Sequence, residues 1–245
     1  MTLFRGWRGV AAITLLAFII AVPLGIAMVQ PVLAALVCPR CFGFVVQTGE
    51  LYVESTMPDE TRAALTTALT EGEKKVADFY GGLRTTPRIL ACASRACVER
   101  LGGGGSKGAA YLSVGLRLAP EGLNPVIIAH ERAHVELHGR IGLLNFWTGA
   151  IPTWFDEGLA AVASDDPRYF RPVGEGDRCR AAPDGVMPER LSDWLKVASR
   201  DPALYARAAC RVLRWTERNG GNAAILRLID RINRGEAFGP VYLRP

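Results

Sequence analysis

The hydrophobic positions along the 245-residue chain follow two periodicities, which separate predicted strands from predicted helices. In the longer stretches apolar residues recur with the spacing of an amphipathic helix. These predicted helices span residues 58–80, 125–138, 153–164, 202–219 and 222–234. Short apolar or alternating runs predict strands at 51–54, 88–93 and 109–112, the last of which can continue to 118. Strands in the first half and helices in the second predict an α+β fold with a small mixed sheet and a helical C-terminal half.

The N-terminal stretch is apolar throughout. Residues 9–37 contain no charged side chain, and Arg5 and Arg8 stand shortly before them. An uncharged run of this length predicts a transmembrane helix, and the two arginines favour a cytoplasmic N-terminus. We therefore expect residues 1–37 to be a single-pass inner-membrane anchor, retained instead of being cleaved as a signal peptide. Residues 38–245 are then one extracytoplasmic, periplasmic domain, although the run from Pro31 onward can also lie at the membrane interface.

Six cysteines follow the predicted anchor. An even number in an exported domain predicts disulfides, and pairing of neighbours in the sequence gives Cys38–Cys41, Cys92–Cys97 and Cys179–Cys210. Two alternatives remain open from the spacing. The first two pairs can form a zinc ribbon, or the C-x-x-C at 38–41 can be a redox motif.

The charged and glycine-rich segments add little about partners. The net charge of +5 suits a domain beside an anionic membrane, and no basic motif interleaved with aromatic residues indicates binding to nucleic acid. Residues 102–106 (GGGGS) predict a flexible loop, either a connector or a lid. Residues 165–190 predict a second loop, whose arginines either favour acidic or C-terminal carboxylate substrates or form a solvated basic face: Arg168, Arg171, Arg178 and Arg180. No feature indicates an oligomeric state.

The predicted helix 125–138 carries the most informative motif, HERAH at 130–134. Residues four apart lie on one face of a helix, so His130 and His134 can bind one metal ion while Glu131 stays free for proton transfer. Asn124 is a good N-cap, and Pro125 suits the first turn. The helix is expected to end at Gly139.

Two imidazoles leave a catalytic zinc ion one protein ligand short. We assign the third to Glu157 in the segment WFDEGLA at 154–160, on the helix predicted from Thr153. Small residues at 158, 160 and 161 are expected to let this helix pack closely on the first. His138 repeats the helical spacing, but one turn further along a straight helix lies too far from a metal held by His130 and His134.

HERAH followed by WFDEGLA resembles the gluzincin metallopeptidases, most closely the small bacterial peptidase-MA-like domains, whose second motif reads W-x-x-E-G-x-A. The similarity continues through LYARAA at 204–209 and GEAF at 235–238, and it covers about residues 108–240. It implies a gluzincin-like (zincin) domain that binds Zn²⁺ through His130, His134 and Glu157, with Glu131 as general base. In the related aminopeptidases the tyrosine that opens the corresponding helix stabilises the oxyanion, and this role falls to Tyr205.

The chemistry expected of such a site is hydrolysis of a peptide bond. Zinc with three protein ligands keeps a position for water and polarises the scissile carbonyl, while Glu131 takes a proton and later delivers it to the leaving amine. The oxyanion needs a further donor. The candidates are Tyr205, Tyr169, Arg171 and Arg207. The resemblance to the aminopeptidases favours Tyr205.

The chain departs from the family pattern at two places. Related enzymes often have a carboxylate one turn after the glutamate ligand to orient a histidine, but Ala161 stands there, which leaves Asp156, Asp165 or Asp166 as substitutes. The edge strand expected to pair with the substrate backbone, at 108–111, lacks the glutamate by which aminopeptidases hold a free amine. An endopeptidase is therefore favoured.

These features predict a membrane-anchored zinc metalloprotease that acts on peptide or protein substrates. The alternative from another class is a catalytically silent envelope protein that keeps the gluzincin fold for binding or scaffolding. A binding module has no need of a general base, so the intact set of His130, Glu131, His134 and Glu157 argues against it.

Overall fold

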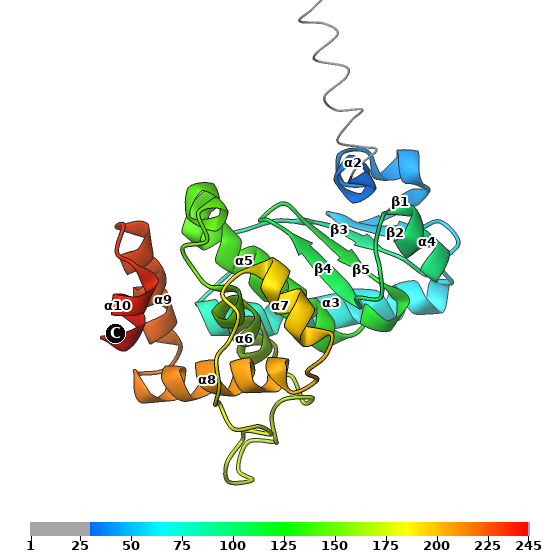
Figure 1. Ribbon diagram of the computed structural model, residues 1–245. Coiled ribbons are helices and arrows are strands. Elements are labelled where there is room, and N and C mark those ends of the chain that lie inside the picture. The colour runs from blue at the N-terminus through cyan, green and yellow to red at the C-terminus, as the bar shows by residue number, and fades with distance from the viewer. Residues whose placement is uncertain (1–29, 245) are drawn as a thin grey trace, which may run out of the picture.

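The structure, a computed structural model, describes residues 30–244. They form an α+β fold in which a five-stranded mixed sheet lies on one side and a group of helices on the other (Figure 1). Helix α5 (Pro125–Trp147) runs between the two halves. The predicted α+β class, with a small mixed sheet and a helical C-terminal half, is confirmed.

The sheet has the strand order β1-β2-β3-β5-β4. Its strands are β1 (Phe44–Thr48), β2 (Leu51–Glu54), β3 (Arg88–Ala91), β4 (Gly108–Tyr111) and β5 (Gly115–Leu118). The two outer pairs are antiparallel, while β2–β3 and β3–β5 are parallel. β1 was not predicted. The strand expected at 109–112 with a continuation to 118 is instead a hairpin of two strands, because Leu112, with φ of 51°, reverses the chain between them.

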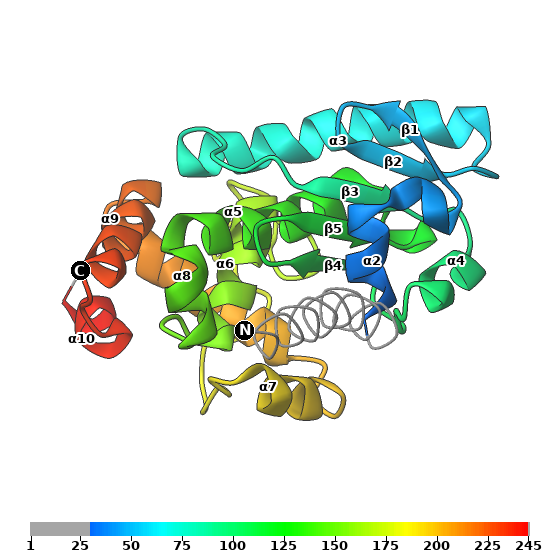
Figure 2. The ribbon, with the colours of Figure 1, turned by 90° about the horizontal axis from the view of Figure 1, so that it is seen from above.

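Helices cover both faces of the sheet. On one face α3 (Asp59–Tyr80) and α5 bury an apolar layer against the strands, and the two helices approach closely at Gly72, where a Cβ would lie 2.8 Å from Ile128 Cγ2. On the other face lie three short elements that the periodicity did not predict: α2 (Pro31–Val37), the 3₁₀ helix η1 (Pro39–Phe42) and α4 (Arg95–Arg100) (Figure 2).

Helix α2 corrects the predicted boundary of the membrane anchor. Val32, Ala35 and Leu36 are buried in the core on this face of the sheet, and Leu36 fills the space that a side chain at Gly115 would need. Residues 31–37 therefore belong to the folded domain. The rest of the predicted anchor, residues 1–29, lies outside the described residues. From residue 30 to 244, no helix has both the length and the apolar character needed to cross a membrane.

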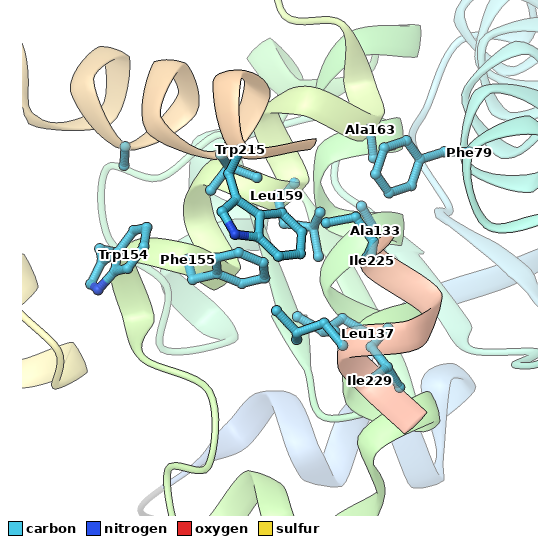
Figure 3. Close-up of a cluster of buried hydrophobic side chains, with 14 of the residues drawn as sticks. Phe79, Ala133, Leu137, Trp154, Phe155, Leu159, Ala163, Trp215, Ile225 and Ile229 are labelled. Carbon is cyan, nitrogen blue, oxygen red and sulfur yellow. The ribbon is translucent and has the colours of Figure 1, made fainter. Parts of the chain in front are cut away.

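The helical half contains the largest core (Figure 3). It is formed by α5, α6 (Thr153–Ser164), α8 (Leu204–Arg218), α9 (Asn222–Asn233), α10 (Phe238–Leu243) and the C-terminal end of α3, with α7 (Leu191–Ala198) alongside. The predicted helices at 153–164, 202–219 and 222–234 are confirmed, whereas α7 and α10 were not predicted. Aromatic and aliphatic side chains from α5, α6, α8 and α9 meet at its centre: Leu137, Trp154, Phe155, Leu159, Trp215, Ile225 and Ile229.

Two glycines act differently from the prediction. Gly139 does not end α5, because it lies inside the helix where a Cβ would approach Thr85 Cγ2 to 2.3 Å, so it permits close packing. The helix breaks instead at Gly142, which has φ of 76°. Gly158 of α6 was expected to face α5 but packs against α8, where a Cβ would lie 2.6 Å from the carbonyl oxygen of Ala208.

The cysteine pairing predicted from sequence neighbours is confirmed. Disulfides join Cys38 to Cys41, Cys92 to Cys97 and Cys179 to Cys210, which excludes the zinc ribbon. A disulfide at 38–41 is also the oxidised form of a redox C-x-x-C motif. The segment 165–190 is mostly irregular, as predicted, and the third disulfide ties it to α8.

Candidate metal centre

Helix α5, which carries His130 and His134, is held in place on several sides by contacts outside the site. The side chain of Asn124 accepts a hydrogen bond of 3.1 Å from the backbone N–H of Ile127, which confirms the predicted N-cap. Val135 packs toward the sheet and Ala133 toward the helical core. His130 and His134 line the cavity beside the helix.

The two imidazoles and one carboxylate converge. His130 Nε2 lies 3.2 Å from His134 Nε2, and Glu157 Oε2 lies 3.5 Å from each of these nitrogens. Donors arranged tetrahedrally at the zinc–nitrogen distance of ~2.0–2.1 Å are separated by roughly 3.3 Å. The three donors therefore fit one ion of this size, and the structure brings together the three predicted metal ligands.

Glu157 reaches this position from the second turn of α6. Its neighbours Phe155 and Leu159 are fully buried in the helical core, so the rotation of the helix is set by packing. Burial alone raises the pKa of Glu157, but hydrogen bonds from His130 and His134 outweigh this effect and lower the pKa to about 2. The carboxylate of Glu157 is thus an anion near neutral pH.

Glu131 lies beside the three donors and packs against the edge strand. A Cβ at Gly108 of β4 would lie 2.5 Å from Glu131 Cγ, so any larger residue there would displace this side chain. Burial raises the pKa of Glu131, while the neighbouring imidazoles oppose the shift. A carboxyl group with a raised pKa is suited to accept and return a proton. Sequence reasoning did not identify Gly108, because its role depends on a contact between distant segments.

Asp156 is the carboxylate that orients a histidine, a role for which the sequence left three candidates. Its Oδ1 lies 2.6 Å from His134 Nδ1, and its Oδ2 lies 2.8 Å from His138 Nε2. The other two candidates have different partners: Asp165 pairs with Arg178, and Asp166 pairs with Arg168.

The contacts of Asp156 also explain two pKa shifts. Its burial raises the pKa of its carboxyl group, but the two imidazoles outweigh this and hold the pKa well below its usual range. Burial lowers the pKa of His134, but Asp156 and Glu157 together raise it well above the usual value. His138, Asp156 and His134 also lie close enough together to hold a metal. Hydrogen bonds already join Asp156 to both imidazoles. We therefore interpret this second group as one that orients the side chains of the first group, His130, His134 and Glu157.

The site opens into a cavity of about 1100 Å³. Residues 105–110, which include most of the edge strand β4, line one side, and α7 with the side chains of Tyr169 and Tyr205 lines another. The two tyrosine rings stack with their centroids 6.2 Å apart. Burial raises the pKa of Tyr205, and it raises that of Tyr169 to about 12, so both hydroxyls keep their proton near neutral pH.

The other two oxyanion candidates are occupied elsewhere. Arg171 donates to the backbone oxygens of Asp177 and Cys179, and Arg207 pairs with Asp201. Neither lines the cavity. Tyr205 and Tyr169 are therefore the two predicted candidates that the structure brings to the site.

Of the four loop arginines, only Arg168 lines the cavity. Its guanidinium is held by the buried carboxylate of Asp166, with Nε 2.9 Å from Oδ2. Arg178 and Arg180 bond within the loop or to its first residue. The solvated basic face is thus the better description of the loop as a whole.

Comparisons with protein-family models, with curated proteins and with solved structures find no match for this chain.

Proposed function

We propose that this protein is a zinc-dependent peptidase of the gluzincin type. The observation that carries the proposal is the convergence of two imidazole nitrogens and the Glu157 carboxylate at 3.2–3.5 Å, with Glu131 beside them in an open cavity. Imidazole and carboxylate donors in a set of three are characteristic of catalytic zinc.

Each residue has a distinct task in this proposal. His130, His134 and Glu157 hold the ion, which when bound acts as a Lewis acid on the scissile carbonyl and makes water more acidic. Glu131 accepts the proton of the attacking water and delivers it to the leaving amine. Tyr205 or Tyr169 donates a hydrogen bond to the carbonyl oxygen as negative charge develops on it.

The cavity favours an extended peptide substrate. In the sheet formed by residues 30–244, β4 is an edge strand, so one side of its backbone can pair with a substrate chain along the cavity. Residues 108–111 contain no carboxylate to hold a free amine, which supports an endopeptidase. The three disulfides support an extracytoplasmic location, and the apolar run at 9–29 supports an inner-membrane anchor.

The test combines metal analysis with a conservative substitution. The purified full chain is expected to contain about one zinc per chain, and Glu131→Gln should retain it because Glu131 is not a ligand. Hydrolysis of carboxymethylated casein by Glu131→Gln should fall by about 10²–10⁴-fold. Glu71→Gln, a change on the exposed side of α3, is the matched control and should keep full activity.

Two results would reject the peptidase. One is a chain that binds zinc but cleaves casein equally, or not at all, in the wild type and Glu131→Gln. The other is a folded chain that binds no zinc. Either result would leave the catalytically silent binding or scaffolding protein as the better description.

A further inference from the structure

The end of α5 beyond its break at Gly142 carries three large apolar side chains that face outward. Leu143, Leu144 and Trp147 are 60%, 77% and 71% exposed. We propose that these residues, which we name the apolar tip, insert into the surface of a lipid bilayer.

The exposure of the apolar tip follows from the local structure. Gly142, whose backbone has φ of 76° and ψ of 165°, turns the chain so that the last residues of α5 leave the direction of the buried helix. Phe146 on the same turn packs inward, with its ring 4.6 Å from that of His138. The remaining three apolar side chains therefore have no place in the core. Contiguous exposed apolar groups of this kind mark interaction sites.

The position of the apolar tip points to the bilayer as the occupant. Helix α2, the first described helix, and the last turn of α5 lie at the same face of the molecule, at the top of Figure 1 and toward the viewer in Figure 2. The chain reaches α2 directly from residues 9–29, an uncharged apolar run typical of a membrane segment. The proposed inner-membrane anchor, on which this inference rests, makes the face at which the chain enters the domain the one nearest the membrane.

The charge pattern agrees with this orientation. Neither residues 30–49 nor residues 137–155 contain an Asp or Glu, although the chain has 24 of these residues in all. Carboxylates are repelled by an anionic lipid surface, so segments that meet it are expected to lack them. Tryptophan is also the side chain most typical of the boundary between lipid and water. Trp147 lines the cavity as well, so insertion places this part of the cavity rim beside the bilayer.

The experiment reads the environment of Trp147 in the full chain, reconstituted into phosphatidylcholine–phosphatidylglycerol vesicles with or without bromine on the acyl chains. The tryptophan emission of the wild type minus that of Trp147→Phe isolates Trp147, because the other tryptophans are present in both. Bromine should quench this difference signal about twofold or more, since it lies within the bilayer. Aqueous iodide should quench it less in vesicles than in urea-unfolded protein. The difference signal for Trp194→Phe, a fully buried residue, is the control and should not respond to bromine.

Three outcomes would overturn the proposal. A Trp147 signal that iodide quenches freely and bromine does not would place the apolar tip in water. Protection from both quenchers would mean that the chain's own residues 9–29 or a second copy covers it. If the chain does not float with the vesicles, it does not bind the bilayer at all.

Discussion

Asp156 and His134 are joined by a hydrogen bond of 2.6 Å between Oδ1 and Nδ1. With the proton on Nδ1, the lone pair of His134 Nε2 points toward His130 and Glu157, the geometry that metal binding requires. His138 donates to the second oxygen of the same carboxylate, at 2.8 Å, and so restrains it from the other side. The orienting acid thus stands directly before the glutamate ligand instead of one turn after it.

Replacing Asp156 with Asn is expected to weaken zinc binding. An amide can donate to Nδ1 as well as accept, so the tautomer of His134 is no longer fixed, and loss of such a partner typically costs about 10–100-fold in metal affinity. The dissociation constant can be measured by competition with a chromophoric chelator. His138→Gln should have a smaller effect in the same direction because it acts only through Asp156. Asp165→Asn, whose carboxylate pairs with Arg178, is the control, and an equal change in all three variants would contradict the orienting role.

Removing the hydroxyl of Tyr205 and removing that of Tyr169 are expected to lower kcat by different amounts. If Tyr205 donates to the oxyanion, Tyr205→Phe should lower kcat by about 10²-fold while KM changes little, since the bond forms only as charge develops. Tyr169→Phe removes the same group from the stacked neighbour and should lower kcat less than about tenfold on that assignment. Steady-state kinetics on one peptide substrate decide between them. The reverse order of effects would assign the role to Tyr169, and full activity in both variants would exclude both.

The sequence predicted those parts of the site that depend on local helical geometry. The spacing of His130 and His134 on one helix determines that their side chains share a face, and Asn124 caps that helix in a way that its own side chain specifies. The choice of Glu157 rested on resemblance as well, because its approach to α5 depends on packing in the helical core.

The features that the sequence did not predict, or predicted wrongly, depend on contacts between residues that are far apart in the chain. Gly139 and Gly142 give the same local signal for the end of a helix, and only the contact between Gly139 and Thr85 distinguishes them. The short helix α7 is held by buried Trp194, which packs edge-on against Tyr205 with centroids 5.0 Å apart. Such contacts cannot be deduced from periodicity, because they join segments whose proximity is a product of the fold.

The close packing of α6 on α8 predicts a stability effect at Gly158. A Cβ there would lie 2.6 Å from the backbone oxygen of Ala208 and 2.7 Å from Val212 Cγ2, so Gly158→Ala must push the helices apart. Overpacking of this kind costs about 1–3 kcal/mol and should lower the Tm in thermal unfolding followed by circular dichroism. Zinc affinity should fall too, since α6 carries Glu157. Gly239→Ala, also in a helix but with open space at its Cβ, should leave the Tm unchanged or slightly raised. A Tm loss no greater for Gly158→Ala than for Gly239→Ala would refute the packing argument.

A buried ion network on α5 predicts a large stability effect away from the site. Glu136 is fully buried, accepts bonds of 2.9 Å from Arg140 Nε and 2.8 Å from the hydroxyl of Thr85, and lies 3.3 Å from Arg132 Nη1. Glu136→Gln leaves two buried arginines without their shared counter-charge, and breaking such a pair typically costs about 3–5 kcal/mol.

Urea unfolding measures this loss against a matched variant. Glu73 approaches Arg132 at 3.5 Å from a partly exposed position, so Glu73→Gln should cost less than about 1 kcal/mol. Zinc affinity of the folded Glu136→Gln protein should stay near the wild-type value, since Glu136 bonds to the backbone at 84–85 and not to the metal ligands. Equal losses of unfolding free energy in the two variants would show that the buried charge of Glu136 contributes no more than an exposed one.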